Sequence, residues 1–279
     1  MDKFVHLHLH TEYSLLDGAA KIKNLFKLCG EKNMPAVALT DHGCLFGVID
    51  FYKTAKEYNK SHPDNQVKPI YGCEFYLCSD LHAKGQGRHN EYYHLVLLAK
   101  NLQGYKNLVK MDSIAYVDGF YYKPRIDYKL LKEHHEGVIC LSACLQGSIP
   151  KMLREGRFED AKKEALFFKD LFGDDFYIEL QDHGIAEQRA LNPQLIKLAR
   201  ELNIKLVATN DVHYLNKEDA KMHEVLLCIQ SRDTLDNPAH WKYETEEFYL
   251  KDYNEMHDLF SYVPEALSNT LEIAEKCNV

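Results

Sequence analysis

The chain has 279 residues, of which 46% are hydrophobic and 27% charged, and its formal net charge is −8. This composition is typical of a globular protein that buries a large core, either as one α/β barrel or as two smaller domains. The acidic balance argues against a chain that holds duplex nucleic acid by itself, because such binding depends on a basic surface. It does not exclude a substrate phosphate that bound metal cations attract.

The sequence contains 8 cysteines and no Cys-x-x-Cys pair, which argues against a structural zinc ribbon. The opening residues Met1-Asp2-Lys3 lead directly into a histidine-rich run, without the apolar segment of a signal peptide. No apolar run reaches the roughly 18 residues that a membrane span needs. We therefore expect a cytoplasmic protein with reduced cysteines and no membrane association.

Short apolar runs recur along the chain and predict seven strands: Phe4–His10, Ala36–Thr40, Ile70–Leu77, His94–Ala99, Val138–Ser142, Phe176–Gln181 and Leu206–Asn210. Segments with the amphipathic period of a helix separate most of them: Ile22–Lys32, Val48–Tyr58, Asn101–Tyr116, Phe158–Phe172 and Asn192–Asn203. This alternation predicts a mainly parallel sheet covered by helices, in the α/β class. The number of units suits a β/α barrel, whose active site lies at the C-terminal ends of the strands.

We expect residues 1–215 to form the barrel and residues 216–279 to form a mainly helical extension that packs on it. The extension has no predicted strand, and it closes with a helical stretch at Pro264–Cys277. Two polar segments, Asn59–Lys68 and Ser79–Glu91, are expected to be exposed loops.

Histidine and carboxylate residues gather at the predicted strand ends. In the first strand, alternation would place His6, His8 and His10 on one face. The second and seventh strands end at Thr40-Asp41-His42-Gly43 and Asn210-Asp211-Val212-His213. Taken singly, each cluster has a plainer explanation, such as a turn at Asp41 or a helix cap at Asp211. Together they predict one polynuclear metal site.

Further candidates follow the same rule of position. Glu74 and His94 are expected to point into the barrel, and Cys144 follows the fifth strand as a thiolate ligand or a small buried residue. We expect His6, Asp182 and His183 to support the ligands from behind, although His183 could equally lie on the surface. A mixed set of His, Asp, Glu and Cys suits two to three Zn, Mn or Fe ions better than Mg²⁺ or Ca²⁺.

These residues resemble the polymerase and histidinol phosphatase (PHP) domain, and more narrowly the N-terminal part of bacterial DNA polymerase III alpha subunits. The resemblance runs over essentially the whole chain. It is carried by the stretches Phe4–Gly18, Ala38–Gly47, Gly119–Asp127, Leu141–Gly147, Ile178–Gly184 and Asn269–Val279.

The resemblance implies a distorted seven-stranded β/α barrel with up to three metals. It implies the ligands His8, His10, Asp17, His42, Glu74, His94, Cys144, Asp211 and His213, all of which are ligand-capable here. It also implies that the parent protein is a DNA-directed DNA polymerase whose catalytic carboxylates lie beyond residue 279. The DNA 3′ end, the polymerase domains and other replicase subunits would then be its partners.

Our leading hypothesis is a metal-dependent phosphodiesterase that acts as a 3′-5′ proofreading exonuclease. We assign catalytic roles to Asp211, His213, His42 and Asp41, and phosphate contacts to Lys123 and Arg125, for which a solvated loop is the alternative. One rival is a catalytically silent, metal-stabilised scaffold that stabilises the polymerase and docks a separate proofreading subunit. The other is a small-molecule phosphatase of the histidinol-phosphate type.

Overall fold

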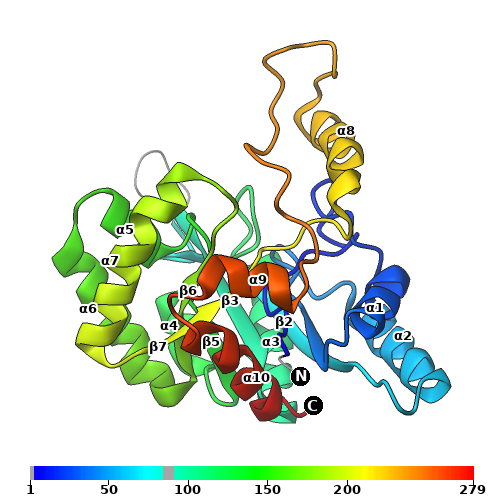
Figure 1. Cartoon of the computed structure of the whole chain (residues 1–279). Helices are drawn as coiled ribbons and strands as arrows, with labels where there is room; N and C mark the ends of the chain where they lie inside the picture. Colours follow the sequence, from blue (N-terminus) through cyan, green and yellow to red (C-terminus); the bar gives the residue numbers. More distant parts are fainter. Residues whose placement is uncertain (1–2, 84–90) are drawn as a thin grey trace.

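The computed structural model describes residues 3–83 and 91–279, and a curled sheet of seven strands forms its centre (Figure 1). The strands are β1 (Ala36–Leu39), β2 (Lys68–Cys78), β3 (Tyr92–Ala99), β4 (Arg125–Asp127), β5 (Val138–Leu141), β6 (Phe176–Leu180) and β7 (Lys205–Ala208). Their order in the sheet is β1-β2-β3-β5-β6-β7, and β4 pairs with β2 beside this path. The predicted α/β class and distorted seven-stranded barrel are confirmed.

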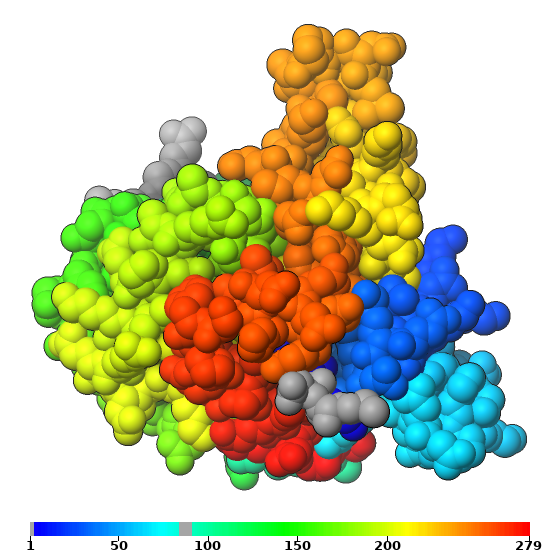
Figure 2. All heavy atoms as spheres, viewed as in Figure 1, coloured from blue at the N-terminus to red at the C-terminus, as the bar shows by residue number. Residues whose placement is uncertain are grey.

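The described residues form ten α-helices, and most of them cover the outside of the sheet. They are α1 (Ile22–Glu31), α2 (Val48–Ser61), α3 (Leu102–Val117), α4 (Tyr128–Glu133), α5 (Ser148–Arg154), α6 (Phe158–Phe172), α7 (Ala186–Leu202), α8 (Ala220–Ser231), α9 (Tyr253–Phe260) and α10 (Glu265–Lys276), with short 3₁₀ helices at Gly173–Asp175 and Lys217–Asp219. In Figure 1, α5, α6 and α7 lie on one side of the sheet and α1 and α2 on the other. The helix α8 and the segment after it project from the body (Figures 1 and 2).

The direction of β3 decides where one site residue lies. The pairs β1–β2, β2–β4, β5–β6 and β6–β7 are parallel, whereas β3 is antiparallel to both β2 and β5. A strand that runs backwards begins at the rim where its neighbours end. His94, near the start of β3, therefore lies at the same rim as the residues that follow β1 and β7.

The predicted first strand, Phe4–His10, is irregular. Among the described residues it makes isolated parallel bridges, from His6 to Val37 and from Leu9 to Val212. Through these bridges the segment joins β1 on one side to the chain after β7 on the other. The sheet nevertheless has seven strands, because β4, which was not predicted, takes the place of this segment in the count. The three residues of β4 are too few to show a periodic pattern.

The apolar residues form an outer and an inner cluster. The outer cluster packs the helices onto the sheet, and the inner cluster fills the curled sheet and includes Val5, Leu7 and Ile70. Ile273 of α10 belongs to the inner cluster, so α10 covers one end of the barrel. The backbone N–H of Val5 donates to Thr270 Oγ1 at 3.2 Å, which ties this helix to the N-terminal segment.

Strand periodicity carries the inner face from apolar packing to polar side chains. Ile70 lies in the inner cluster, and Glu74, four residues further along β2, is on the same face of the strand. Tyr177 and Glu179 repeat this relation on β6. The interior is therefore apolar at the α10 end and lined by ionisable groups at the other.

The helix predictions were mostly confirmed, with three omissions and one wrong boundary. The short helices α4, α5 and α9 were not predicted. The helix predicted to begin at Asn192 begins at Ala186, so that Pro193 lies inside it. Proline removes one intrahelical hydrogen bond, but the buried side chains of Gln188 and Leu191 hold the preceding turn against the barrel.

The C-terminal extension packs on the barrel, and its predicted helix corresponds to α10. Tyr214 and Tyr249 form a parallel bridge, and Asn269 Nδ2 donates to the carbonyl of Leu206 at 2.8 Å. The division at residue 215 stays a prediction. None of the described helices is long and apolar enough to cross a membrane. Most of the loop predicted at Ser79–Glu91 lies outside the described residues.

The carboxyl of Asp112 on α3 should destabilise the fold at neutral pH. Its Oδ1 is buried without a hydrogen-bond partner among the described residues, and burial raises the pKa of Asp112 to about 6. In the unfolded chain this carboxyl titrates near pH 4, so only the folded state binds its proton between about pH 4 and 6, and stability falls as pH rises through that range. Asp112→Asn should raise the free energy of unfolding by about 1–3 kcal/mol at pH 7, and by less as the pH falls below 6.

Urea unfolding between pH 4.5 and 8 measures this effect. Asp118→Asn, at the exposed C-terminal end of the same helix, is the matched control. A gain for Asp112→Asn that does not change with pH would contradict the explanation.

Candidate metal centre

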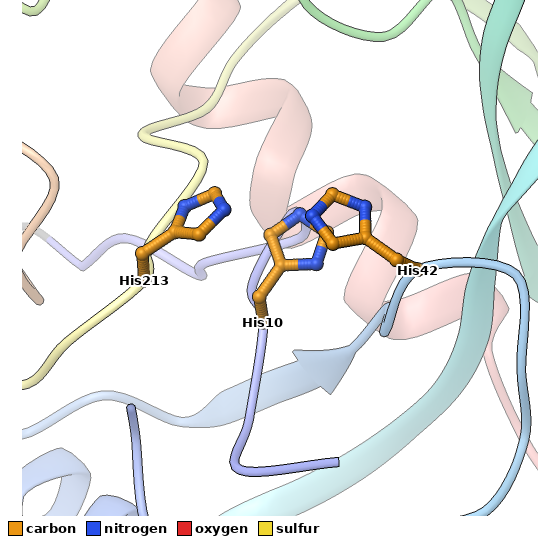
Figure 3. A group of neighbouring side chains, drawn as sticks. All are labelled: His10, His42 and His213. Atoms are coloured by element: carbon orange, nitrogen blue, oxygen red, sulfur yellow. The ribbon is translucent and has the colours of Figure 1, made fainter. Parts of the chain in front are cut away.

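Seven of the predicted ligands form three overlapping clusters in which the ligand atoms lie within 4.8 Å of one another. The clusters are His8, His10, Glu74 and Asp211; His42, Glu74 and His94; and His10, His42 and His213. Figure 3 shows the last of these, with the rings of His10 and His42 close together and His213 beside them. Segments far apart in the sequence thus supply one group of side chains.

Two carboxylates form the middle of the group. Nε2 of His8 lies 2.8 Å from Glu74 Oε2 and 3.2 Å from Asp211 Oδ1. Nε2 of His10 lies 3.0 Å from each of the same two oxygens. Two acids and two imidazoles therefore meet in a space from which water is almost excluded, since three of the four residues have no exposed surface and Asp211 is 8% exposed.

The remaining predicted ligands surround this middle. Nδ1 of His42 lies 3.5 Å from Glu74 Oε2, and Nδ1 of His94 contacts Glu74 Oε1. Asp17 Oδ2 lies 2.9 Å from His42 Nε2, and Cys144 Sγ lies 3.7 Å from His94 Nδ1. The structure thus brings all nine predicted ligands together, and their role as ligands stays a prediction.

Several of these atoms are close to one another without being hydrogen-bonded. Among the described residues, no hydrogen bond reaches these buried atoms: His10 Nε2, His42 Nδ1, Glu74 Oε1, Asp211 Oδ1 and His213 Nε2. Buried polar atoms without partners are costly. The shared oxygen, nitrogen and sulfur donors fit divalent cations such as zinc, manganese or iron, which would satisfy these atoms together. The buried clusters are consistent with a multinuclear metal site.

The protonation of the imidazoles follows their neighbours. Burial by itself lowers the pKa of His8, but the carboxylates of Asp211, Glu179 and Glu74 outweigh it and raise this pKa well above the ordinary value. For His213, burial and then the charge of His10 lower the pKa to about 3. Protons on His8 compete with a cation for the same nitrogen, so acid conditions should oppose metal binding.

The backbone is strained where two of the ligands are presented. Asp211 has a φ of 43° and Ala143, which precedes Cys144, has a φ of 63°. Residues other than glycine rarely adopt this left-handed backbone conformation, although Asp tolerates it better than most. Hydrogen bonds from Val212 N to His8 O at 3.2 Å and from His10 N to Val212 O at 2.7 Å hold the turn at Asp211.

Three residues that the sequence analysis did not select support this centre. Glu179 Oε1 lies 3.3 Å from His8 Nδ1, which leaves the Nε2 of His8 for the cluster. The hydroxyl of Tyr243 donates to Asp17 Oδ1 at 3.1 Å, and His223 Nε2 lies 3.7 Å from the same oxygen. Glu179 could have been found, because it follows the inward-facing Tyr177 by two residues. Nothing in the local pattern marks Tyr243 or His223.

Asp41, predicted as catalytic, occupies a supporting position. Its Oδ1 accepts hydrogen bonds from Thr11 N at 2.6 Å and Ser14 Oγ at 2.7 Å, and its Oδ2 accepts from Thr11 Oγ1 at 2.8 Å. Ser14 Oγ also lies 3.2 Å from His10 Nδ1. Asp41 therefore shapes the turn that orients His10, and it acts through Ser14.

The residues expected behind the ligands differ in what they contact. His6 does not share a face with His8: its Nε2 donates to Lys251 O at 2.8 Å, because the irregular segment breaks the alternation between Leu7 and His8. Asp182 pairs with Arg189 at 3.1 Å, near the surface. His183 is buried, and its Nε2 donates to the carbonyl of Asn210 at 2.7 Å, directly before Asp211. Of these three residues, only His183 thus supports the segment that carries a candidate ligand, Asp211.

The phosphate-contact prediction for Arg125 is wrong. Its side chain is fully buried, and its guanidinium donates to the backbone carbonyls of Gly119, Leu81 and Ala83 at 3.1–3.3 Å. All three guanidinium nitrogens thus donate to the backbone, away from the candidate metal centre. Lys123, in contrast, is exposed and lies over the ring of Tyr76, with Nζ 5.3 Å from the ring centroid.

A cavity of about 450 Å³ opens onto the centre. Asp17, His42 and His94 line it, together with Lys123. A second cavity, of about 280 Å³, shares these three residues and also reaches Cys144, Asp211 and His213. The candidate ligands are therefore accessible to a molecule from outside, and Lys123 lines the same cavity.

This chain is thus an α/β protein with a curled sheet and a candidate multinuclear metal centre, built from His, Asp and Glu side chains near the strand ends. The PHP domain family matches residues 6–183, and the chain belongs to this family. It is 50% identical to the DNA polymerase III subunit alpha of Borreliella burgdorferi over 278 residues, which cover 99% of this chain and 24% of the relative. For the same subunit of Thermus aquaticus the identity is 46%, over 99% of this chain and 23% of the relative.

The chain spans about a quarter of the length of these curated relatives, and it matches their N-terminal region. Among solved structures, a candidate metal-dependent phosphoesterase from Bifidobacterium adolescentis covers 94% of this chain, and this chain 96% of it, at 12% identity and a TM-score of 0.46. A histidinol phosphate phosphatase from Lactococcus lactis, solved with zinc, L-histidinol and phosphate, covers 77% of this chain and is covered to 88%, at 11% identity and a TM-score of 0.35. At these TM-scores neither structure bears on the chemistry of this chain.

The role assigned to Arg125 predicts a loss of stability on substitution. Arg125→Ala leaves three buried carbonyls without donors and should lower the free energy of unfolding by about 2–4 kcal/mol. Lys123→Ala, at the exposed neighbouring position, should change it by less than about 0.5 kcal/mol. Urea unfolding measures both, and unchanged stability of Arg125→Ala would contradict this structural role.

The three clusters predict bound metal that depends on His8. Protein purified without chelator should contain about two to three equivalents of Zn, Mn or Fe by elemental analysis, and His8→Ala should lose at least one of them. His62→Ala, which removes an exposed imidazole, should retain them all. Metal-free wild-type protein would contradict the assignment.

Proposed function

We propose that this chain is the metal-dependent phosphodiesterase module of a DNA polymerase III alpha subunit and removes nucleotides from the 3′ end of DNA as a proofreading exonuclease. The observation that carries the proposal is the meeting of Glu74, Asp211 and five imidazoles in overlapping clusters that open onto a cavity. The similarity to polymerase subunits over nearly the whole chain supports the replicative context. In that context we expect the protein in the cytoplasm, beside polymerase domains of the same polypeptide and other replicase subunits.

The chemistry follows from what the side chains can hold. His8, His10, Asp17, His42, Glu74, His94, Cys144, Asp211 and His213 would hold the metals. Divalent ions bound there would lower the pKa of a coordinated water and stabilise charge that develops on a phosphodiester. Lys123 would meet a neighbouring phosphate in the same cavity. Asp41, Glu179 and Tyr243 would keep His10, His8 and Asp17 in position.

Asp211→Asn tests the proposal. Because this carboxylate contacts both His8 and His10, its loss should lower metal-dependent release of 3′ nucleotides at least about 100-fold, with the helical content unchanged. Activity is measured on a labelled oligonucleotide with each of Zn, Mn and Fe, in this chain and in the complete polymerase subunit. Asp182→Asn, which removes a carboxylate paired with Arg189, is the matched control. Equal activity of Asp211→Asn and the wild type would refute the assignment.

A second candidate function is a metal-stabilised scaffold that stabilises the polymerase and docks a separate proofreading subunit. The observation that favours it is charge: the net charge is −8, and Lys123 is the one cationic side chain among the described residues that line the larger cavity. This function would replace the first if the wild-type protein binds metal, loses stability when the metal is removed, and fails to cleave DNA whichever metal is supplied.

A further inference from the structure

The larger cavity has an unusual wall. Phe46, Tyr116 and Trp241, called here the aromatic wall, line it and have 54%, 36% and 48% of their surfaces exposed. The rings of Phe46 and Tyr116 contact each other, with centroids 5.5 Å apart and planes tilted by 42°. Large aromatic side chains are usually buried, so three of them half-exposed around one cavity indicate a surface made to contact something.

The aromatic wall and the candidate metal centre belong to the same cavity. Asp17, His42 and His94 line the part that contains the centre. A molecule whose phosphate lies at these residues must present its remaining groups to the rest of the lining. The volume of about 450 Å³ is within the range of cavities that hold small organic groups, roughly 300–1,000 Å³.

The aromatic surface also continues beyond the cavity. Tyr116 contacts Phe120, with ring centroids 6.3 Å apart, and the ring of Phe120 is 49% exposed. A ligand longer than one nucleotide could therefore extend its contacts from Tyr116 onto Phe120. A small phosphomonoester would use none of this outer surface.

The scarcity of positive charge around the cavity favours single-stranded over duplex DNA as the ligand. A protein that grips duplex DNA follows the phosphates with many basic side chains, whereas Lys123 is the one cation among the described residues that line this cavity. Unpaired bases expose their faces and stack on aromatic side chains, and stacking of this kind tolerates any base. An aromatic wall with one lysine therefore fits an unpaired strand and does not fit a duplex.

We propose that the cavity binds the unpaired 3′-terminal nucleotides of single-stranded DNA, with bases stacked on Phe46, Tyr116 and Trp241 while a phosphodiester lies at the metal centre. This inference rests on the proposed function and names its substrate. The aromatic wall then selects frayed ends, because a paired terminal base must first unpair and leave its stacking neighbour before it can enter the cavity and reach these rings. Because stacking tolerates any base, we expect a frayed 3′ nucleotide to be removed whatever base it carries.

Trp241 makes a direct test available, because it is the single tryptophan of the chain. Its fluorescence is titrated with oligothymidylate whose 3′ linkages are phosphorothioates, which slow cleavage, and with an abasic oligonucleotide of equal length. Stacking predicts quenching by oligothymidylate and little quenching by the abasic strand or by blunt duplex. Equal quenching by the base-bearing and abasic strands, or none by either, would overturn the proposal.

A second test uses substitutions in the aromatic wall. Phe46→Ala combined with Tyr116→Ala should lower the ratio of kcat/KM for base-bearing over abasic 3′ ends by about 5- to 100-fold. Phe46→Tyr and Tyr116→Phe, which keep the rings, should restore the ratio. Tyr52→Ala, which removes a half-exposed ring that is not part of the cavity lining, is the matched control.

The outcomes separate the two proposals. Cleavage of both ends with an unchanged ratio would overturn the stacking inference and leave the phosphodiesterase assignment standing. If the wild type cleaves neither end with any metal, the phosphodiesterase assignment fails, and the tryptophan titration decides by itself whether the cavity binds unpaired bases.

Discussion

The structure depends on the compensation of charge around two buried carboxylates. Glu74 and Asp211 lie in the interior of the curled sheet, where a lone carboxylate would be strongly disfavoured. Each contacts the Nε2 atoms of His8 and His10, and the nearby imidazoles hold the pKa of each carboxyl well below its usual range although burial acts to raise it. Divalent ions would complete the compensation and satisfy the donors that remain free.

The rest of the barrel can be understood as what holds these groups in place. The inner face of the strands changes from apolar side chains over α10 to ionisable ones at the opposite rim, so the same strand periodicity builds the core and presents the site. The antiparallel direction of β3 brings His94 to that rim. The strained turn at Asp211 is held by hydrogen bonds to the N-terminal segment, which also carries His8 and His10. Folding of the two ends of the chain is thereby tied to assembly of the site.

The extension after residue 215 belongs to the site as well as to the surface. Tyr243 contacts Asp17, and the backbone of Phe248 accepts a hydrogen bond from His213 N at 2.8 Å. Trp241 lines the cavity from the same segment. The residues that match the PHP domain family, 6–183, thus do not contain the whole centre, since Asp211, His213 and these supporting groups follow them. The extension decides both how Asp17 is oriented and what surface a ligand meets.

The sequence by itself determined the α/β class, most of the strands and helices, and the side chains that gather at the rim. It could do so because periodicity and strand-end position are local properties, visible wherever an apolar run ends in His or Asp. Only the tertiary structure decided what those side chains contact. Arg125 looked like a phosphate ligand, but two of its three carbonyl acceptors, Leu81 and Ala83, lie more than 40 residues earlier in the chain. Likewise Asp41 supports a turn, and Tyr243 reaches Asp17 across 226 residues. Contacts at such separations depend on how the strands pair and curl, which no local pattern in the sequence records.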